Sequence, residues 1–199
     1  MASAPIRDRP RLSVELFRGF LAGRPEEERW ELIDGVAVMM APPTKAHQRI
    51  ASNLERLLND APEARAPRLA AYQRVGVNLG PRVENYDPEP DVVVVDVEHD
   101  NERYSDRFYL AAEIVSSSDR TYIESKRAVY RLHDTCTCIL TVQQDRVEVR
   151  IDLRAEAGWD EQVLKRLGDP LVLAEFGLRC KVSDLYRGTS LAPRQAESQ

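Results

Sequence analysis

Three charged residues, Asp91, Glu113 and Lys126, lie in segments whose other residues are largely apolar. Asp91 precedes four consecutive valines, and Glu113 follows an apolar run of five residues. A charged group in a segment with core character carries a desolvation cost, so it needs a partner, a metal ion or a catalytic role. Two carboxylates and an ammonium group are what metal-dependent hydrolysis of a phosphodiester requires, and this chemistry is our first hypothesis.

The segments that carry the two acids are predicted to be strands. Both are apolar on each face, which is typical of strands in the centre of a sheet. If they pair as a simple antiparallel hairpin with Val97 opposite Phe108, Asp91 lies beside Ile114 and therefore close to Glu113. One metal ion could then bridge the two carboxylates.

Lys126 lies in a predicted helix that ends near His133 and follows a cluster of capping-type residues at 116–119. Ile123, Lys126 and Tyr130 are spaced i, i+3 and i+7, so they share one face of the helix. An ordinary solvated lysine is expected on the opposite face. The spacing therefore predicts that Lys126 points toward the sheet.

A fourth charged residue, Glu31, is also expected on an apolar face. It belongs to an alternating segment around Asp34-Gly35, which is a strong signal for a two-residue hairpin turn. This hairpin pairs Glu31 with Val38, and the period of two places the carboxylate among apolar side chains.

Two amphipathic helices are predicted before the first acidic strand. Ser13 is expected to cap a helix that ends at Leu21. Thr44 is expected to cap the next helix, whose apolar stripe includes His47. The remaining predicted strands and closing segment are 72–79, 135–142, 146–153, 163–167 and 177–186.

The chain of 199 residues is long enough for one domain with a sizeable core, and 43% hydrophobic and 31% charged residues are ordinary for a soluble globular protein. The net charge of −5 argues against a protein that coats nucleic acid by bulk electrostatics. It does not exclude a nuclease, because a basic groove can be local. We expect one domain over residues 10–187, with flexible termini at 1–9 and 188–199.

Three cysteines without a paired CxxC spacing argue against a disulfide framework or a structural zinc site. The chain has no apolar run long enough to span a bilayer, and its N-terminus lacks the apolar core of a signal peptide. A cytoplasmic protein without membrane contact is therefore expected.

Several short motifs occur in a characteristic order. They are Glu31-Leu32-Ile33-Asp34-Gly35, Pro42-Pro43 with His47, Pro90-Asp91 with its valines, Glu113-Ile114-Val115-Ser116, and Lys126 with Tyr130. Each motif is weak alone, but the ordered set resembles the large bacterial family known as "putative restriction endonucleases", formerly a domain of unknown function, within the PD-(D/E)xK nuclease superfamily. The resemblance covers roughly residues 10–187.

This resemblance implies an α/β fold with a restriction-endonuclease-like core, in which helices flank a mixed central β-sheet. It further implies a hydrolase: an endonuclease that cleaves DNA with a divalent metal ion, usually Mg²⁺, with Mn²⁺ as a substitute. A homodimer is a further expectation, because nucleases of this fold often pair to cut both strands.

Residue by residue, Asp91 matches the aspartate of the Pro-Asp half-motif and Glu113 the glutamate of the (D/E)xK half-motif. Both are therefore expected to bind the metal. Val115 occupies the position where the superfamily usually has lysine. The family typically supplies this lysine from the following helix, and Lys126 matches that position.

Glu31 and His47 match further recurrent positions of the family. Glu31 is expected to reach the metal through a water molecule, and His47 to contact the substrate or hold Glu31. The chain departs from the family pattern after Tyr130, where members often carry an aromatic residue and an aspartate and this chain has an apolar segment at 138–142. The departure concerns the later strand rather than the site.

Each residue also has a non-catalytic interpretation. Asp91 can cap a strand end, Glu113 can be the structural partner of Lys126, Glu31 can pair with His47 or an arginine, and His47 can be a satisfied core residue. Lys126 can also extend past its neighbours to solvent. For the whole protein, the alternatives are a noncatalytic nucleic-acid or protein-binding module that retains the nuclease fold, and a metal-dependent hydrolase of RNA or nucleotides.

Overall fold

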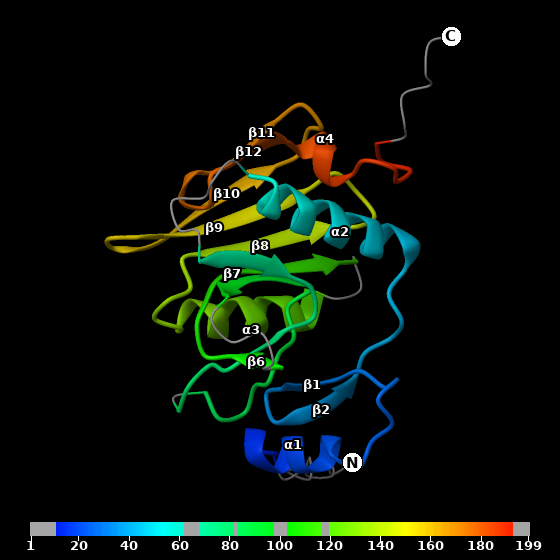
Figure 1. Cartoon of the computed structure of the whole chain (residues 1–199), viewed down its shortest axis with the longest axis vertical. Coiled ribbons are helices and arrows are strands. Elements are labelled where there is room, and N and C mark those ends of the chain that lie inside the picture. Colours follow the sequence, from blue (N-terminus) through cyan, green and yellow to red (C-terminus); the bar gives the residue numbers. More distant parts are fainter. Residues whose placement is uncertain (1–10, 62–67, 82, 98–102, 117–119, 193–199) are drawn as a thin grey trace, which may run out of the picture.

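The computed structural model describes residues 11–61, 68–81, 83–97, 103–116 and 120–192 (Figure 1). The elements are α1 (Val14–Leu21), β1 (Trp30–Ile33), β2 (Val36–Met39), α2 (Lys45–Asn59), β3 (Leu69–Tyr72), β4 (Gly76–Val77), β5 (Val92–Asp96), β6 (Tyr104–Ser105), β7 (Phe108–Val115), α3 (Arg120–Arg131), β8 (Cys138–Gln143), β9 (Val149–Ala155), β10 (Gly158–Leu164), β11 (Pro170–Leu173), η1 (Ala174–Phe176), β12 (Leu178–Lys181) and α4 (Val182–Leu185).

The central sheet has six strands in the order β10-β9-β8-β7-β5-β3. Strands β7 and β8 are parallel, and the other neighbours are antiparallel. A parallel pair needs a crossover connection, and α3 provides it. The predicted fold, a mixed sheet flanked by helices, is confirmed.

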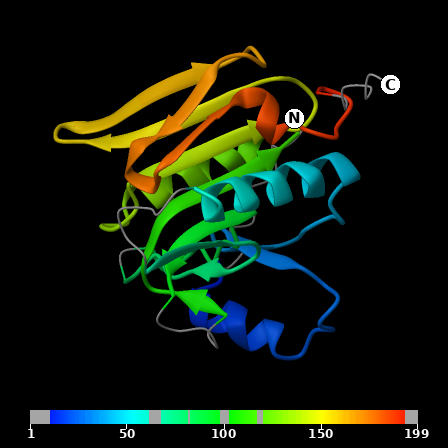
Figure 2. The same ribbon diagram turned by 45° about the horizontal axis from the view of Figure 1, so that its top comes forward.

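The two faces of the sheet are covered by different helices. Val92 and Val94 pack in the same apolar cluster as Ile50 and Leu54 of α2. Val93 and Val95 pack instead in a second apolar cluster, together with residues of β1, α3 and β8. Figure 2 shows α2 crossing in front of the sheet and α3 behind it. Because side chains of a strand alternate between faces, Val93 and Val95 of β5 and Ala111 of β7 all point toward α3.

The pairing of β5 with β7 differs from the predicted hairpin. Val92 lies opposite Ala112 and Val95 opposite Phe108, with a shift of register after Val94. The prediction that Val97 lies opposite Phe108 is therefore wrong. A bulge inserts an unpaired residue, and the connection between the strands contains β6, which pairs with β4 in a separate sheet.

The β1–β2 hairpin agrees with the prediction: Glu31 pairs with Val38. Its turn residues Asp34 and Gly35 both have positive φ, of 50° and 74°. A Cβ on Gly35 would lie 2.6 Å from Cβ of Arg11, so the turn needs glycine for space as well as for conformation.

The first two helices begin where the sequence predicts. The Ser13 hydroxyl accepts a hydrogen bond from the backbone of Leu16, and Thr44 does the same for His47. The expected capping cluster before α3 falls mainly on 117–119, outside the described residues. No helix in the described part of the chain is long and apolar enough to cross a membrane.

Two strand predictions are wrong in their boundaries. The segment 72–79 is split between β3, which joins the central sheet, and β4, which does not. Arg74 breaks the strand because its φ is 61°, a conformation that ordinary strand residues do not adopt. The strand expected at 163–167 begins at Gly158 and ends at Leu164, and β11 was not predicted.

Residues 188–192, which we assigned to a flexible terminus, pack against the body of the protein. Thr189 is only 8% exposed, and the backbone N–H of Gly188 donates to the carbonyl of Ala192 over 3.2 Å. Asn53 of α2 holds the preceding chain by donating to the carbonyls of Leu185 and Arg187. The chain therefore keeps contact with the body of the protein as far as Ala192.

Candidate active site

Asp91 lies just before β5 and Glu113 lies near the end of β7, so both are at the same end of these neighbouring antiparallel strands. Oδ2 of Asp91 accepts a hydrogen bond of 2.8 Å from the backbone N–H of Ile114. The predicted proximity of the two acids therefore holds although the register does not. Glu113 faces the α3 side of the sheet, as Ala111 does two residues earlier.

Lys126 joins the acids from α3. Its Nζ lies 2.7 Å from Oε1 of Glu113 and 2.9 Å from Oε2 of Glu31. Lys126 is 4% exposed, so it does not extend to solvent. One ammonium group therefore links a strand of the central sheet to the β1–β2 hairpin.

Tyr130, which the sequence analysis named in a motif but not as a site residue, also contacts Glu113. Its hydroxyl donates a hydrogen bond of 2.6 Å to the same oxygen, Oε1 of Glu113, that Lys126 contacts. The signal for this contact is its position one helical turn after Lys126, on the same face of α3.

Arg29 is a second residue of the site to which the sequence analysis assigned no role. Its guanidinium lies 3.6 Å from Oε1 of Glu31 and 3.6 Å from Oδ1 of Asp91, and it pairs with Glu89 at 3.3 Å. The position two residues before Glu31 is the available signal, because residues i and i+2 of a strand share a face.

His47 contacts Asp91 rather than Glu31. Its Nε2 lies 3.1 Å from Oδ1 of Asp91, and the side chain reaches there from the first turn of α2. The expectation that His47 holds Glu31 is therefore wrong. All five predicted site residues nevertheless line one hollow.

This hollow has a volume of about 390 Å³. Its polar wall contains Arg29, Glu31, His47, Asp91, Glu113 and Lys126. Its apolar wall comes from the second strand of the hairpin and the segment that leads to α2, including Val38, Met39, Met40, Ala41, Pro42 and Pro43. The charged groups are thus recessed at one side of a space that a substrate group can enter.

The pKa values of Glu113 and Asp91 are shifted in opposite directions. Burial raises the pKa of Glu113 to about 7, and the attraction of Lys126 only partly offsets this effect. Burial also acts to raise the pKa of Asp91, but the hydrogen bond from His47 and the charge of Lys126 outweigh it. The pKa of Asp91 therefore lies below its ordinary value.

The pKa values of the groups on α3 are raised. Burial acts to lower the pKa of Lys126, but the negative charges of Glu113 and Glu31 outweigh burial and raise it. Burial raises the pKa of Tyr130 well above its ordinary value, and the adjacent Glu113 adds to this effect. Lys126 is thus a stable cation, and Tyr130 remains a hydrogen-bond donor.

The oxygen donors suit a hard divalent cation such as Mg²⁺. Oε1 of Glu31 is buried and has no hydrogen-bond partner among the described residues. No three His, Cys, Asp or Glu side chains form a cluster that could hold a metal ion in the described ranges. A site of this kind therefore depends on one or two carboxylates together with water and substrate oxygens, as Mg²⁺ sites commonly do.

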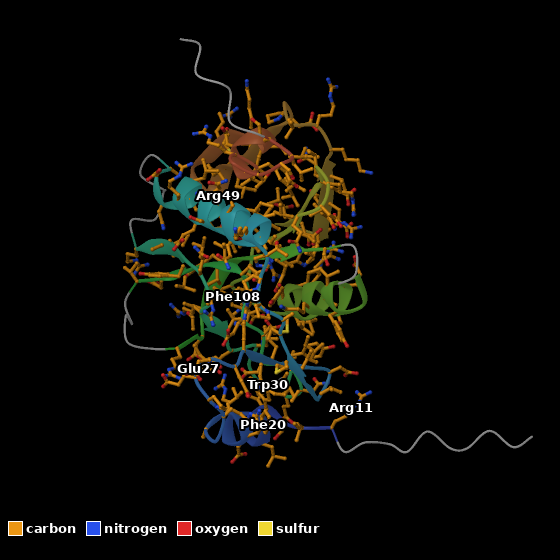
Figure 3. The ribbon with its side chains drawn as sticks, turned by 90° about the vertical axis from the view of Figure 1, so that its right-hand side faces the viewer. Arg11, Phe20, Glu27, Trp30, Arg49 and Phe108 are labelled. Atoms are coloured by element: carbon orange, nitrogen blue, oxygen red, sulfur yellow. The ribbon has the colours of Figure 1, made fainter. Side chains whose placement is uncertain are left out.

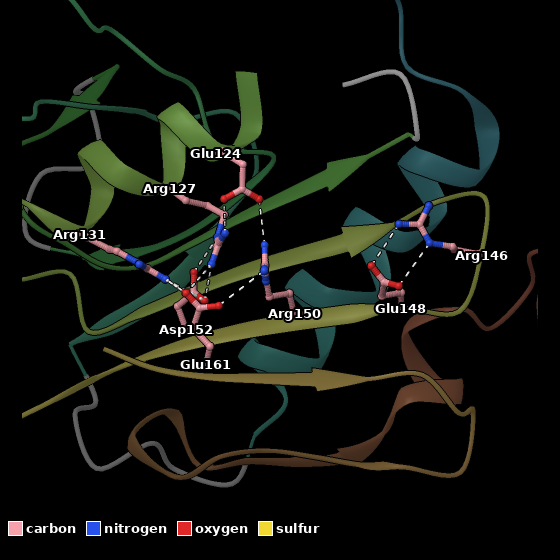
Figure 4. Close-up of polar contacts among 8 residues, drawn as sticks. All are labelled: Glu124, Arg127, Arg131, Arg146, Glu148, Arg150, Asp152 and Glu161. Carbon is pink, nitrogen blue, oxygen red and sulfur yellow. Dashed lines mark hydrogen bonds and ion pairs between the residues drawn. The ribbon is translucent and has the colours of Figure 1, made fainter. Parts of the chain in front are cut away.

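A second group of ion pairs fixes α3 on the sheet (Figure 4). Arg127, next to Lys126, makes two hydrogen bonds to the fully buried Asp152 of β9, at 2.8 and 2.7 Å. Arg131 lies 3.3 Å from Asp152, and Glu161 of β10 binds Arg131 at 2.6 Å. These contacts restrain the position of the helix that carries Lys126.

Comparisons with known proteins agree with this architecture. A family model described as "Uma2: Putative restriction endonuclease" matches residues 14–183. The fold is similar to a crystal structure described as a "putative nuclease belonging to DUF820" from Anabaena variabilis, with a TM-score of 0.65 and 17% sequence identity over 84% of this chain and 94% of that chain. No curated protein matches. The family match covers most of the chain, which therefore belongs to the Uma2 family of "putative restriction endonucleases".

Proposed function

We propose that this protein is a metal-dependent endonuclease that hydrolyses phosphodiester bonds of DNA. The observation that carries the proposal is the meeting of Asp91, Glu113 and Lys126 in the wall of one hollow. Two carboxylates and one cation, recessed beside open space, are suited to phosphodiester hydrolysis. Membership of a restriction-endonuclease family supports the same reaction class.

In this proposal Asp91 and Glu113 hold Mg²⁺. The bound ion supplies Lewis-acid stabilisation of the phosphoryl oxygens and a water molecule of lowered pKa. Lys126 donates hydrogen bonds to the attacking water or to the oxygen that gains charge in the transition state. Since its pKa is raised, Lys126 acts as a fixed positive charge and not as a proton donor.

The surrounding residues orient these groups. His47 and the backbone N–H of Ile114 each hold one oxygen of Asp91. Tyr130 holds Oε1 of Glu113. Arg29, close to two of the acids, is suited to bind a phosphate oxygen at the mouth of the hollow.

A noncatalytic nucleic-acid or protein-binding module is the second candidate. One observation favours it: Lys126 already pairs with both Glu113 and Glu31, so both acids have a cationic partner without a metal ion. In that case the charged cluster only stabilises the fold, and divalent cations have no effect on ligand binding.

Cleavage assays distinguish the two candidates. Purified protein is incubated with duplex DNA, single-stranded DNA and RNA, in Mg²⁺, Mn²⁺ or EDTA. We expect cleavage of DNA only with a divalent cation, and its loss in Asp91→Asn and Glu113→Gln. Asp160→Asn, an exposed acid on β10, is the matched control and should retain activity. Metal-independent activity, or full activity in the Asp91 and Glu113 variants, would exclude the mechanism.

A further inference from the structure

Three adjacent hollows, which together we call the groove, extend from the candidate active site along the exposed face of α2. We propose that this groove binds the sugar-phosphate backbone of one strand of the nucleic-acid substrate. The proposal rests on the nuclease function proposed above, and it assigns the path of the substrate beyond the reacting phosphate.

Neighbouring hollows of the groove have lining residues in common. The hollow of about 390 Å³ that contains the acids shares Arg29, His47 and Asp91 with a second hollow of about 340 Å³. The second hollow in turn shares Gln48 and Ser52 with a third of about 570 Å³. Each boundary thus includes at least one residue of α2, so the three hollows follow one another along this helix.

The second and third hollows are lined by positive charge. Arg29 and Arg74 line the second hollow, and Lys45 and Arg49 line the third. Among the described residues that line either of them, Asp91 is the only acid. For a chain with a net charge of −5, this is a local concentration of cations suited to a polyanion.

Lys45 and Arg49 are also available for a ligand. Both are exposed, and within the described part of the chain neither lies within ion-pair distance of a carboxylate. Arg56, about two turns beyond Arg49 along α2, is by contrast paired with Asp60 at 3.1 Å. Cations left without an acidic partner on one face of a helix are what phosphate contacts require.

The far wall of the third hollow is formed by residues 188–190. Asn53 holds the chain just before them through two backbone carbonyls, at 2.8 and 2.9 Å. Gly188 lies against the side chain of Arg49, whose position on α2 is visible in Figure 3. The exposed hydroxyls of Ser52 and Ser190 supply further hydrogen-bonding groups, as is common at phosphate and sugar contacts.

The backbone at Arg74 also points to a binding role. This residue lies in the left-handed region with φ of 61°, which is unusual for a residue other than glycine. The conformation ends β3 and leaves an exposed cation beside the second hollow. Strained residues of this kind concentrate at sites that bind ligands.

Binding of oligonucleotides at different salt concentrations tests the proposal. The full chain, in EDTA to prevent cleavage, is titrated with labelled single-stranded DNA, duplex DNA and RNA. The test variant is Lys45→Gln/Arg49→Gln. The control is Arg166→Gln/Arg179→Gln, which removes two exposed cations that line none of the three hollows. Loss of two phosphate contacts is expected to weaken binding and to reduce the slope of log K against log salt by about 1.4 for single strands and about 1.8 for duplex.

The outcomes separate the groove from the catalytic proposal. A reduced salt slope in the test variant alone supports the groove, even if the protein cleaves nothing. An unchanged slope overturns the groove, even if the wild-type protein cleaves DNA. Equal loss in the control variant also overturns it, because the effect would then follow total charge. A wild-type protein that binds no oligonucleotide at low salt overturns the groove, whereas the cleavage assay with a divalent cation decides the catalytic proposal. The RNA arm identifies which backbone is preferred.

Discussion

Nζ of Lys126 lies 2.7 Å from Oε1 of Glu113, and both side chains are buried. The pair joins α3 to the central strand β7, so the position of the helix and the charge state of the acid depend on each other. A divalent cation that binds Glu113 must share this carboxylate with the ammonium group. The second partner of Lys126, Glu31, allows the ammonium to stay in place when that happens.

The stability of the metal-free protein should therefore depend on the protonation of Glu113. Burial raises the pKa of this group from an ordinary value of 4.5 to about 7. Between these values the folded protein retains a proton that the unfolded chain has released, so the contribution of Glu113 to stability decreases as pH rises through this interval. We expect Glu113→Gln to gain stability relative to the wild type from pH 4.5 to pH 7. Urea unfolding across this interval measures the difference, and parallel pH profiles would contradict the prediction.

Lys126→Met should separate binding from turnover. The carboxylates proposed to hold the cation remain, so Mn²⁺ binding measured by calorimetry should be largely retained. Loss of one donor to the developing charge is expected to slow cleavage by about 10²- to 10³-fold. Lys165→Met is the control and should keep the wild-type rate, because this exposed lysine directly follows β10 and does not line the hollow of the candidate site. An unchanged rate in the Lys126 variant would assign the ammonium a structural role only.

The Arg127–Asp152 pair should contribute to stability and not to metal binding. Asp152 is fully buried, and its replacement by Asn leaves Arg127 buried with only the more exposed Glu124 and Glu161 nearby. We expect a loss of about 3 kcal/mol, the lower end of the range for breaking a buried pair, because these acids remain. The exposed Arg56–Asp60 pair is the comparison, and Asp60→Asn should cost about 0.5 kcal/mol or less. Equal losses in chemical denaturation of the two variants would contradict this assignment.

Local periodicity alone brought several side chains to the correct surfaces. The Asp34-Gly35 turn sets the register that pairs Glu31 with Val38, because a two-residue turn leaves one alignment of the flanking strands. The i, i+3 and i+7 spacing around Lys126 identifies the buried face of α3, since side chains at these intervals share one side of a helix. These properties depend on residues close together in the chain, so the sequence is sufficient to derive them.

The tertiary structure decided which charged groups meet. A bulge in β7 shifted its alignment with β5, yet the hydrogen bond from Ile114 keeps Asp91 beside Glu113. His47 reaches Asp91 instead of Glu31, and the positions of Arg29 and the wall at 188–190 follow from how distant segments pack. Ion pairs form between whichever opposite charges share a buried volume, and that volume exists only after strands, helices and turns from the whole chain have packed together.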